Sequence, residues 1–342
     1  MTVKSYYKDI HGIVKLNSNF PLPGFKVGEI SEPDIVIEVK KDIDFSKEGL
    51  SRLDFWFYGK EGGDFVYYED TFFGVKNKVL LKNLNGQTEV LCNKSVLRLD
   101  RFYPPRSRKS FNDLVGTIIR IKLIKNGYLN IHAACLSKDG ITILLAAFPQ
   151  MGKTLSTLQL LKEGFKYISE DTVLVDSKGN AYFTPTISAI HYDFLKFIDR
   201  RKIGFWKYYK ILLKTWIIKK SEFMNRILEP PKINLLEMVN NEPIRKSKVK
   251  IACTLEIGDR RIEEVDKETL AKKILAINRY SLPRIITSPF IWAYSYFNDF
   301  DITEIEEMER RTLLNFLEGC ECFNLACNDK NWISLFKDMG VV

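Results

Sequence analysis

The stretch ILLAAFPQMGKTLSTLQLLKEGFKYISEDTVLVD, from Ile143 to Asp176, contains three features in the order that a phosphate-binding site requires. An apolar run typical of a strand leads into the loop AFPQMGKT, and leucines at helical spacing follow the loop. The loop fits the relaxed phosphate-loop pattern Ala-x-x-x-x-Gly-Lys-Thr, in which Ala replaces the first Gly. The stretch therefore predicts a strand, a loop, a helix and a second strand, which is an α/β arrangement.

The retained positions of this loop have the chemistry that a nucleotide needs. Backbone N–H groups of the loop and of the helix N-terminus would point at phosphate oxygens, where the helix dipole favours anions. Lys153 would supply a positive charge for the β- and γ-phosphates of ATP, and Thr154 a hydroxyl for Mg²⁺. The expected nucleotide contacts are Ala147, Gln150, Met151, Gly152, Lys153, Thr154 and Leu155.

Two glycines that such loops usually carry are replaced. Ala147 stands where the strand turns, and alanine costs little there if its backbone is not left-handed. Gln150 stands in mid-loop, where a glycine often allows the backbone to approach phosphate, and Pro149 removes one N–H donor. The alternative is that the loop is only a turn between a strand and a helix.

The next acidic residues, Glu170 and Asp171, begin 17 positions after Lys153. Adjacent residues of a regular strand point to opposite faces, so a bend is needed to bring both acids to the loop. One acid would then hold Mg²⁺, directly or through water, and the other would accept a substrate proton. A solvent-exposed charged pair at the end of a strand is the alternative.

The segment IHAACLSKDGITILLAAFPQMGKTLSTLQLLKEGFKYISEDTVLVD resembles the HPr kinase/phosphorylase family and its phosphoenolpyruvate-carboxykinase-like relatives. The similarity extends weakly through Leu255 to Val265. The resemblance implies an α/β mixed-sheet P-loop kinase core that follows an N-terminal β-rich domain. It also implies transfer of the ATP γ-phosphoryl group to a hydroxyl with Mg²⁺. The shared features are His132-Ala133, the hairpin Lys138 to Gly140, the loop Ala147 to Thr154, the helix ending at Gly164, and Glu170-Asp171.

The resemblance also implies roles for single residues. Glu170 would be the general base, Asp171 the acid on the metal side with Thr154, and His132 a neighbour of the phosphates. The family usually has Asp where this chain has Glu170, and the extra methylene would displace the base. Arg260 or Arg261 is expected to assist at the transferring phosphoryl group. For His132 a hydrogen-bonded core histidine is the alternative.

The acceptor stays open between a peptide or protein and a small molecule. The family's HPr-recognition segment is not found after the acids, so HPr itself is not expected to be the substrate. Relatives often assemble, which makes a homo-oligomer an alternative to a monomer. Two other functions compete with the kinase: a nucleotide-binding regulatory protein without turnover, and a peripheral membrane-binding protein.

The domain prediction is an N-terminal β-rich domain at 1–105 and the kinase-like domain at 106–342. Short segments rich in β-branched and aromatic residues fill the region from Asp34 to Leu99. The prolines and cations of Arg101 to Ser110 suggest a linker, and an apolar stripe predicts a helix that ends at Asn126-Gly127.

A basic segment interrupts the second domain at about residues 196–230. From Lys196 to Lys220 there are nine Lys or Arg against one acid. The segment predicts an amphipathic helix whose apolar face, Phe205, Tyr209, Leu212 and Trp216, packs on the protein while its lysines are solvated. Alternatively, the segment binds a phosphorylated or acidic substrate, or it lies on an anionic membrane surface. Nucleic acid is not expected, because no stacking platform accompanies the cations.

The whole chain has 342 residues, 45% of them hydrophobic and 28% charged, as is usual for a globular protein. Its N-terminus lacks a signal-peptide core, and its longest apolar run is far short of a membrane span. A cytoplasmic protein is therefore expected, with peripheral membrane contact as an alternative. The six cysteines are expected to be buried or reduced thiols, with a zinc site in CECFNLAC as the alternative.

Overall fold

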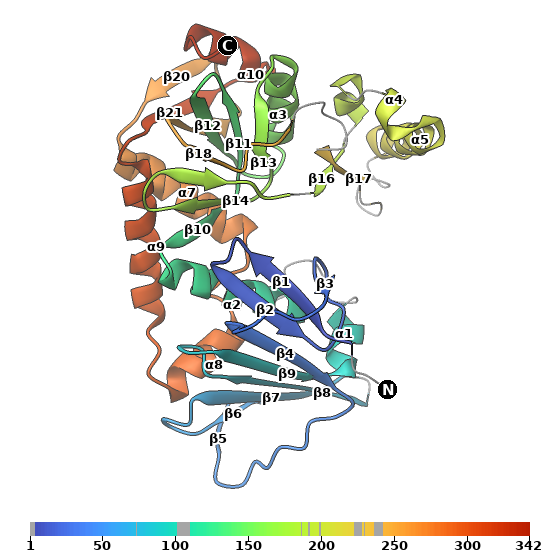
Figure 1. Ribbon diagram of the computed structural model, residues 1–342, viewed down its shortest axis with the longest axis vertical. Helices are drawn as coiled ribbons and strands as arrows, with labels where there is room; N and C mark the ends of the chain where they lie inside the picture. Colours follow the sequence, from blue (N-terminus) through green and yellow to red (C-terminus); the bar gives the residue numbers. More distant parts are fainter. Residues whose placement is uncertain are drawn as a thin grey trace. The chain divides into compact units, whose positions relative to one another are not determined.

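The computed structural model describes residues 4–342 except 73, 101–109, 186, 191, 198–199, 222–227, 229 and 236–241. The chain divides into two compact units: unit 1 comprises Met1–Gly127 and Pro283–Glu309, and unit 2 comprises Tyr128–Leu282 and Arg310–Val342. Both units combine helices with β-sheet (Figure 1), so the mixed α/β class expected from the sequence is confirmed.

Unit 1 is built on a nine-stranded sheet with the order β3-β1-β2-β4-β9-β8-β7-β6-β5. Its neighbours are antiparallel except for the pairs β2-β4 and β4-β9. Ile35, Ile37 and Val39 are buried in alternation with more exposed residues, which is the period of two that a strand requires. The strands are β1 (Tyr6–Ile10), β2 (Val14–Ser18), β3 (Lys26–Val27), β4 (Ile35–Lys40), β5 (Ser51–Leu53), β6 (Phe57–Gly59), β7 (Phe65–Phe72), β8 (Val75–Lys82) and β9 (Thr88–Asn93).

The helices of unit 1 are α1 (Lys94–Asp100), α2 (Phe111–Lys125) and α8 (Pro289–Phe297), together with the first half of α9 (Ile302–Leu317). The helix predicted to end at Asn126-Gly127 is α2, and the side chain of Ser110 caps its N-terminus. The predicted linker at Arg101 to Ser110 lies outside the described residues except for Ser110 itself.

Two buried cations tie α2 to unit 1. Arg120 donates to the carbonyl of Pro283 and pairs with Glu309 of α9, and Lys122 donates to the carbonyls of Leu84 and Gly86. The structure therefore groups α2 with the N-terminal sheet, whereas the sequence division at 105/106 assigned this helix to the second domain. The return of 283–309 to the same unit has no local signal in the sequence.

Unit 2 contains a six-stranded sheet with the order β13-β11-β12-β19-β21-β20. Its central strands β12, β19 and β21 are parallel, and β11, β13 and β20 pair antiparallel at its two edges. A four-stranded sheet, β10-β14-β15-β18, and the pair β16-β17 complete the unit. The strands are β10 (Tyr128–Ile131), β11 (Ala133–Lys138), β12 (Ile141–Ala146), β13 (Lys166–Ser169), β14 (Val173–Asp176), β15 (Asn180–Tyr182), β16 (Ile187–Ala189), β17 (Lys232–Asn234), β18 (Lys246–Lys248), β19 (Ile251–Glu256), β20 (Arg261–Glu264) and β21 (Glu321–Ala326).

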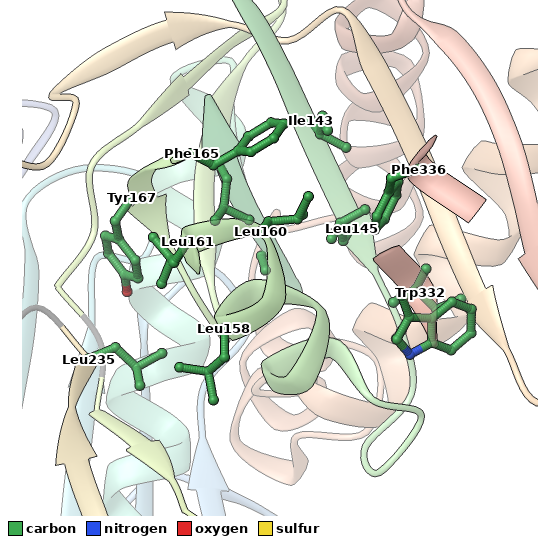
Figure 2. Packing of buried hydrophobic residues seen from close by; sticks show 14 of the residues in the cluster. Ile143, Leu145, Leu158, Leu160, Leu161, Phe165, Tyr167, Leu235, Trp332 and Phe336 are labelled. Carbon is green, nitrogen blue, oxygen red and sulfur yellow. The ribbon is translucent and has the colours of Figure 1, made fainter. Parts of the chain in front are cut away.

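The core of unit 2 lies between the six-stranded sheet and α3. Figure 2 shows Leu160 of α3 close to Leu145 of β12 and Phe336 of α10, while Leu158 of α3 and Trp332 of α10 belong to the same apolar cluster. All five side chains are almost completely buried. This packing fixes the start of α3 relative to the end of β12. The helices of the unit are α3 (Lys153–Lys162), the 3₁₀ helix η1 (Tyr192–Phe197), α4 (Arg200–Ile203), α5 (Phe205–Lys220), α7 (Lys267–Ser281), the second half of α9 and α10 (Trp332–Asp338).

The predicted apolar face of the basic segment is wrong. Tyr208, Ile211, Thr215 and Ile218 form the buried face of α5, whereas three of the four residues assigned to that face, Phe205, Tyr209 and Trp216, are exposed. The two stripes lie side by side on the helix, and the aromatic spacing alone did not say which one faces the protein. In the described part of the chain, no helix combines the length and apolar composition needed to cross a bilayer.

Candidate active site

The loop between β12 and α3 is the one that the sequence singles out. Ala147 is completely buried, in the apolar cluster between the sheet and α3, and its φ is not positive. Gln150 stands where loops of this pattern usually have a glycine, and its φ of 71° shows that this position does adopt the left-handed conformation. Its side chain is exposed, so the cost is confined to the backbone, on the order of 1 kcal/mol.

Gly152 is required at the start of α3 for two reasons. Its φ is 103°, where side chains are disfavoured, and a Cβ at this position would lie 2.6 Å from Nε1 of Trp332. Trp332 is fully buried, and its indole N–H has no hydrogen-bond partner among the described residues. The glycine therefore lets the loop pass directly over the tryptophan ring.

Lys153, the first residue of α3, is only 7% exposed. Its Nζ lies 3.0 Å from Nε2 of His132, 3.4 Å from the carbonyl oxygen of Asp171 and 3.5 Å from the Asp171 carboxylate. Burial lowers the pKa of Lys153, while the charges of Asp171 and Glu170 oppose that shift. The ammonium is thus largely removed from water and only loosely paired.

Thr154 meets the other acid. Its Oγ1 donates to Oε1 of Glu170 at 2.6 Å, and Glu170 is only 2% exposed. The structure therefore gathers Thr154 with Glu170, and Lys153 with Asp171 and His132. The sequence had grouped Thr154 with Asp171 on the metal side.

Two opposed breaks in the strands bring these residues to the loop. The second strand predicted in the opening stretch, which follows the helix and runs from Phe165 to Asp176, is two strands in different sheets. The break falls at Glu170-Asp171-Thr172. The segment from Tyr128 to Lys138 breaks likewise at His132, into β10 and β11. Because β10 pairs with β14 and β11 with β13, the two breaks face each other. The bend that the paired acids needed is present, with Asp171 at a φ of 76°.

His132 is held by a residue that the sequence did not indicate. Its backbone N–H donates to Oδ1 of Asn278 in α7, and the Asn278 amide donates in turn to the carbonyl of Asn130. Asn278 lies 146 positions away along the chain and is completely buried. The imidazole has Nε2 beside Lys153 and Nδ1 3.5 Å from the Asp171 carboxylate. A protonated Lys153 requires a lone pair at Nε2, so the histidine proton belongs on Nδ1, facing Asp171.

Lys330 is a second residue near the loop that the sequence alone did not indicate. Its Nζ donates to the carbonyl of Gln150 at 3.1 Å, and its own φ is 56°. It follows β21, which is parallel to β12 and separated from it in the sheet by β19. A second cation is therefore attached to the loop between β12 and α3.

Of the other residues predicted for the site, Met151 and Leu155 lie at the loop and the start of α3, whereas Arg260 does not. Met151 packs its side chain on the apolar cluster, and its N–H donates to Phe148 within the loop. Leu155 is half-buried in the first turn of α3. Arg260 pairs with Ser334 and Asp338 of α10, and none of its described contacts is with the cluster around Lys153.

Arg261 pairs with Glu256 and Glu263. Among the described residues, neither arginine has a contact with the predicted site. The residue of this region that does reach the loop is Trp332, at the N-terminus of α10, whose ring lies against Gly152.

One pair of side chains has the oxygen donors that a Mg²⁺ ion would need. Among the described residues, no three His, Cys, Asp or Glu side chains converge as a metal cage. Mg²⁺ in phosphoryl-transfer sites needs no such cage, because one or two carboxylates, phosphate oxygens and waters complete its shell. The hydroxyl of Thr154 and the carboxylate of Glu170, 2.6 Å apart, are oxygen donors of this kind. All six cysteines are free thiols, with no metal group around the three of the CECFNLAC segment in the described residues.

Comparison of the chain with protein-family models and with curated proteins gives no match.

Proposed function

We propose that the chain is an ATP- and Mg²⁺-dependent kinase that transfers the γ-phosphoryl group to a hydroxyl of a peptide, a protein or a small molecule. One observation carries this proposal: the first turn of α3 gathers both acids and the histidine. Lys153 contacts His132 and Asp171, and Thr154 contacts Glu170. A turn without function has no need to bury a lysine among these groups.

In this proposal the ATP phosphates bind at the N-terminus of α3. The helix dipole and the free N–H groups of its first turn favour an anion there. Lys153 would gain most from a bound phosphate, because burial disfavours its charged form and the charges of Asp171 and Glu170 only partly oppose that effect. Lys330, attached to Gln150, adds a second cation at the loop.

The two acids would divide the remaining work. Thr154 and Glu170 would hold Mg²⁺, which supplies charge neutralisation on the phosphates. Asp171 would act on the acceptor side, since its side chain is 54% exposed and can be reached by a substrate hydroxyl. This exchanges the roles that the family resemblance implied, and it follows from which acid contacts Thr154.

Asp171 and His132 would form the proton-accepting pair. The carboxylate would take the proton of the attacking hydroxyl, and the Nδ1–H of His132 beside it would hold its orientation. Lys153, 3.5 Å from the same carboxylate, would help to hold it in place.

The proposed function goes together with a more specific fold for unit 2 than the mixed α/β class. We infer a phosphoenolpyruvate-carboxykinase-like P-loop core for unit 2. The phosphate loop after the central parallel strand β12, and the paired acids at a strand break facing it, support this assignment.

Calorimetric titration with ATP and Mg²⁺ tests nucleotide binding. The wild type is expected to bind with a Kd on the order of micromolar to millimolar. The variant Thr154→Val should bind ATP with a much weaker dependence on Mg²⁺, because it loses the hydroxyl but keeps the size of the side chain. Absence of binding by the folded wild type would sink the proposal.

Transfer of labelled γ-phosphate tests the division between the acids, with water, hydroxyl-bearing peptides and small alcohols as acceptors. Asp171→Asn should lower the transfer rate about 10²–10⁴-fold with unchanged Mg²⁺ dependence. Glu170→Gln should instead raise the Mg²⁺ concentration needed for half-maximal rate. The reverse pattern would return the roles to those implied by the resemblance.

A nucleotide-binding regulator without turnover is the second candidate. It is favoured by Gln150, whose side chain and left-handed backbone stand where a glycine usually approaches the phosphates. This function predicts that ATP binds with no transfer to any acceptor, so that Asp171→Asn has no transfer rate to lower.

A further inference from the structure

Helix α5 is anchored to unit 2 along one narrow face. Tyr208, Ile211, Thr215 and Ile218 are buried, and the first two belong to the apolar cluster that also contains α3. Arg200 of α4 lies over the Tyr208 ring, 5.1 Å from its centroid. The helix is thus fixed to the protein by its inner face, and its orientation leaves the opposite face outward.

That outward face is apolar. Its exposed fractions are 65% for Phe205, 78% for Trp206, 48% for Tyr209, 59% for Leu213 and 47% for Trp216. Isolated exposed apolar residues are ordinary, but five large ones on a single helix of 16 residues form a continuous stripe. A stripe of this kind is costly in water and needs a partner that removes it from water.

The charges of α5 complete the pattern. The helix contains five lysines and no Asp or Glu. At about 100° per residue, Lys207, Lys210 and Lys214 follow one edge of the apolar stripe, and Lys219 and Lys220 close its C-terminal end. An apolar stripe flanked by cations is complementary to a surface with anionic groups above an apolar layer.

We propose that α5 binds the surface of a membrane that contains anionic lipids, with Trp206 and Leu213 inserted among the acyl chains and the lysines at the headgroups. The aliphatic Leu213 at the centre of the stripe, between aromatic residues at both ends, favours a lipid phase over stacked bases. The absence of any acid in the helix favours a surface of uniform negative charge over a protein with both signs. In Figure 1, α4 and α5 lie beside β16 and β17 at the edge of unit 2.

Sedimentation of the full chain with lipid vesicles tests the proposal. The vesicles are phosphatidylcholine alone, or phosphatidylcholine with roughly one-third phosphatidylserine to supply a negative surface potential. The wild type is expected to bind the anionic vesicles at least about tenfold more tightly than the neutral ones. Binding should weaken as salt shortens the screening length.

Two variants separate the apolar and the charged contributions. Trp206→Ser with Leu213→Ser should weaken binding to anionic vesicles about tenfold or more, through lost apolar insertion. Lys207→Gln with Lys210→Gln and Lys214→Gln should weaken it by up to roughly fivefold per lysine. All five positions are partly or fully exposed, so both variants should fold, which circular dichroism checks.

Matched controls remove equal groups elsewhere. Trp292→Ser with Tyr296→Ser removes two exposed aromatic residues of α8, 49% and 70% exposed, and should bind vesicles as the wild type does. Lys26→Gln with Lys60→Gln and Lys272→Gln makes the same change in net charge at exposed positions and should lower the affinity by less than about twofold. Lys153→Ala should also bind normally, which keeps this test independent of the proposed nucleotide site.

Three results would overturn the proposal. The first is equal binding by the wild type and the Trp206/Leu213 variant, which would leave a purely electrostatic contact. The second is equal weakening by the control variants. The third is binding of single-stranded RNA or an acidic protein by the wild type, lost in the α5 variants, with no binding to vesicles.

Discussion

Two buried lysines, one in each unit, illustrate different uses of the same side chain. In unit 1, Lys122 donates to the carbonyl of Leu84 at 3.0 Å and closely to that of Gly86. In unit 2, Lys153 has an imidazole at 3.0 Å and its nearest Asp171 oxygens at 3.4 and 3.5 Å. Carbonyls hold the first ammonium in place, whereas the second has an imidazole and more distant oxygens around it, which under the proposed function would give way to a phosphate. Burial lowers the pKa of both lysines, so burial by itself does not identify a functional site.

The largest effect expected from this contrast is on nucleotide affinity. Lys153→Met should weaken ATP binding about 100-fold, close to 2.7 kcal/mol, because the phosphate loses its buried countercharge. The free energy of unfolding should stay unchanged or rise by about 1 kcal/mol, since a poorly compensated buried charge is removed. Calorimetry and urea denaturation measure the two quantities, and a strongly destabilised variant would make Lys153 a structural residue like Lys122.

The opposite result is expected in unit 1. Lys122→Met should lower the free energy of unfolding of unit 1 by about 2 kcal/mol, because two carbonyl groups lose their donor. ATP affinity should not change. Hydrogen exchange of the amides in β8 and β9 measures the local stability. The contrast between the lysines would be broken if this variant also lost nucleotide binding.

A pH dependence sharpens the same contrast. Burial lowers the pKa of Lys122 from 10.5 to about 8, so between these values the unfolded chain holds a proton that the folded chain has released. Stability therefore rises with pH in this window, by about 1.5 kcal/mol between about pH 8 and 9.5. Subtracting the curve of Lys122→Met removes the contributions of other groups. Parallel curves for the two proteins would contradict the assignment.

The smallest effect concerns backbone strain. Gln150→Gly should raise the free energy of unfolding by about 0.5–1 kcal/mol, because a φ of 71° suits glycine, and it should tighten ATP binding if the side chain obstructs the phosphates. Glu32→Gly in unit 1, at a φ of 50° and also exposed, is the matched control and should change stability alone. Equal behaviour of the two variants towards ATP would show that Gln150 is an ordinary turn residue.

The sequence was most informative where chemistry and local geometry coincide. The loop, the start and end of α3 and the helix α2 follow from residues close in sequence, whose caps and periodicity are local properties. A bend at Glu170-Asp171 was expected, but a division into strands of two different sheets was not. The break at His132 was not predicted, because it lies in a run with good strand propensity. Only the pairing of segments about 40 residues apart makes the two breaks meet.

Other parts of the candidate site depend on long-range packing. Asn278 reaches His132 from α7, and Trp332 reaches Gly152 from α10, with no periodic or motif signal in the sequence. The face of α5 was predicted wrongly for a related reason. Two apolar stripes share that helix, and only tertiary packing decides which is buried.

The intrinsic fluorescence of Trp332, which lies against Gly152, can be used to follow the loop without a label. Trp332 is the one completely buried tryptophan of the five: Trp206, Trp216 and Trp292 are 78%, 47% and 49% exposed, and Trp56 is half-buried. An aqueous quencher such as iodide would silence mainly the exposed indoles and leave the emission of Trp332. Because that ring lies against Gly152 of the loop between β12 and α3, a shift of the residual emission would report movement of the loop in unlabelled protein, in real time.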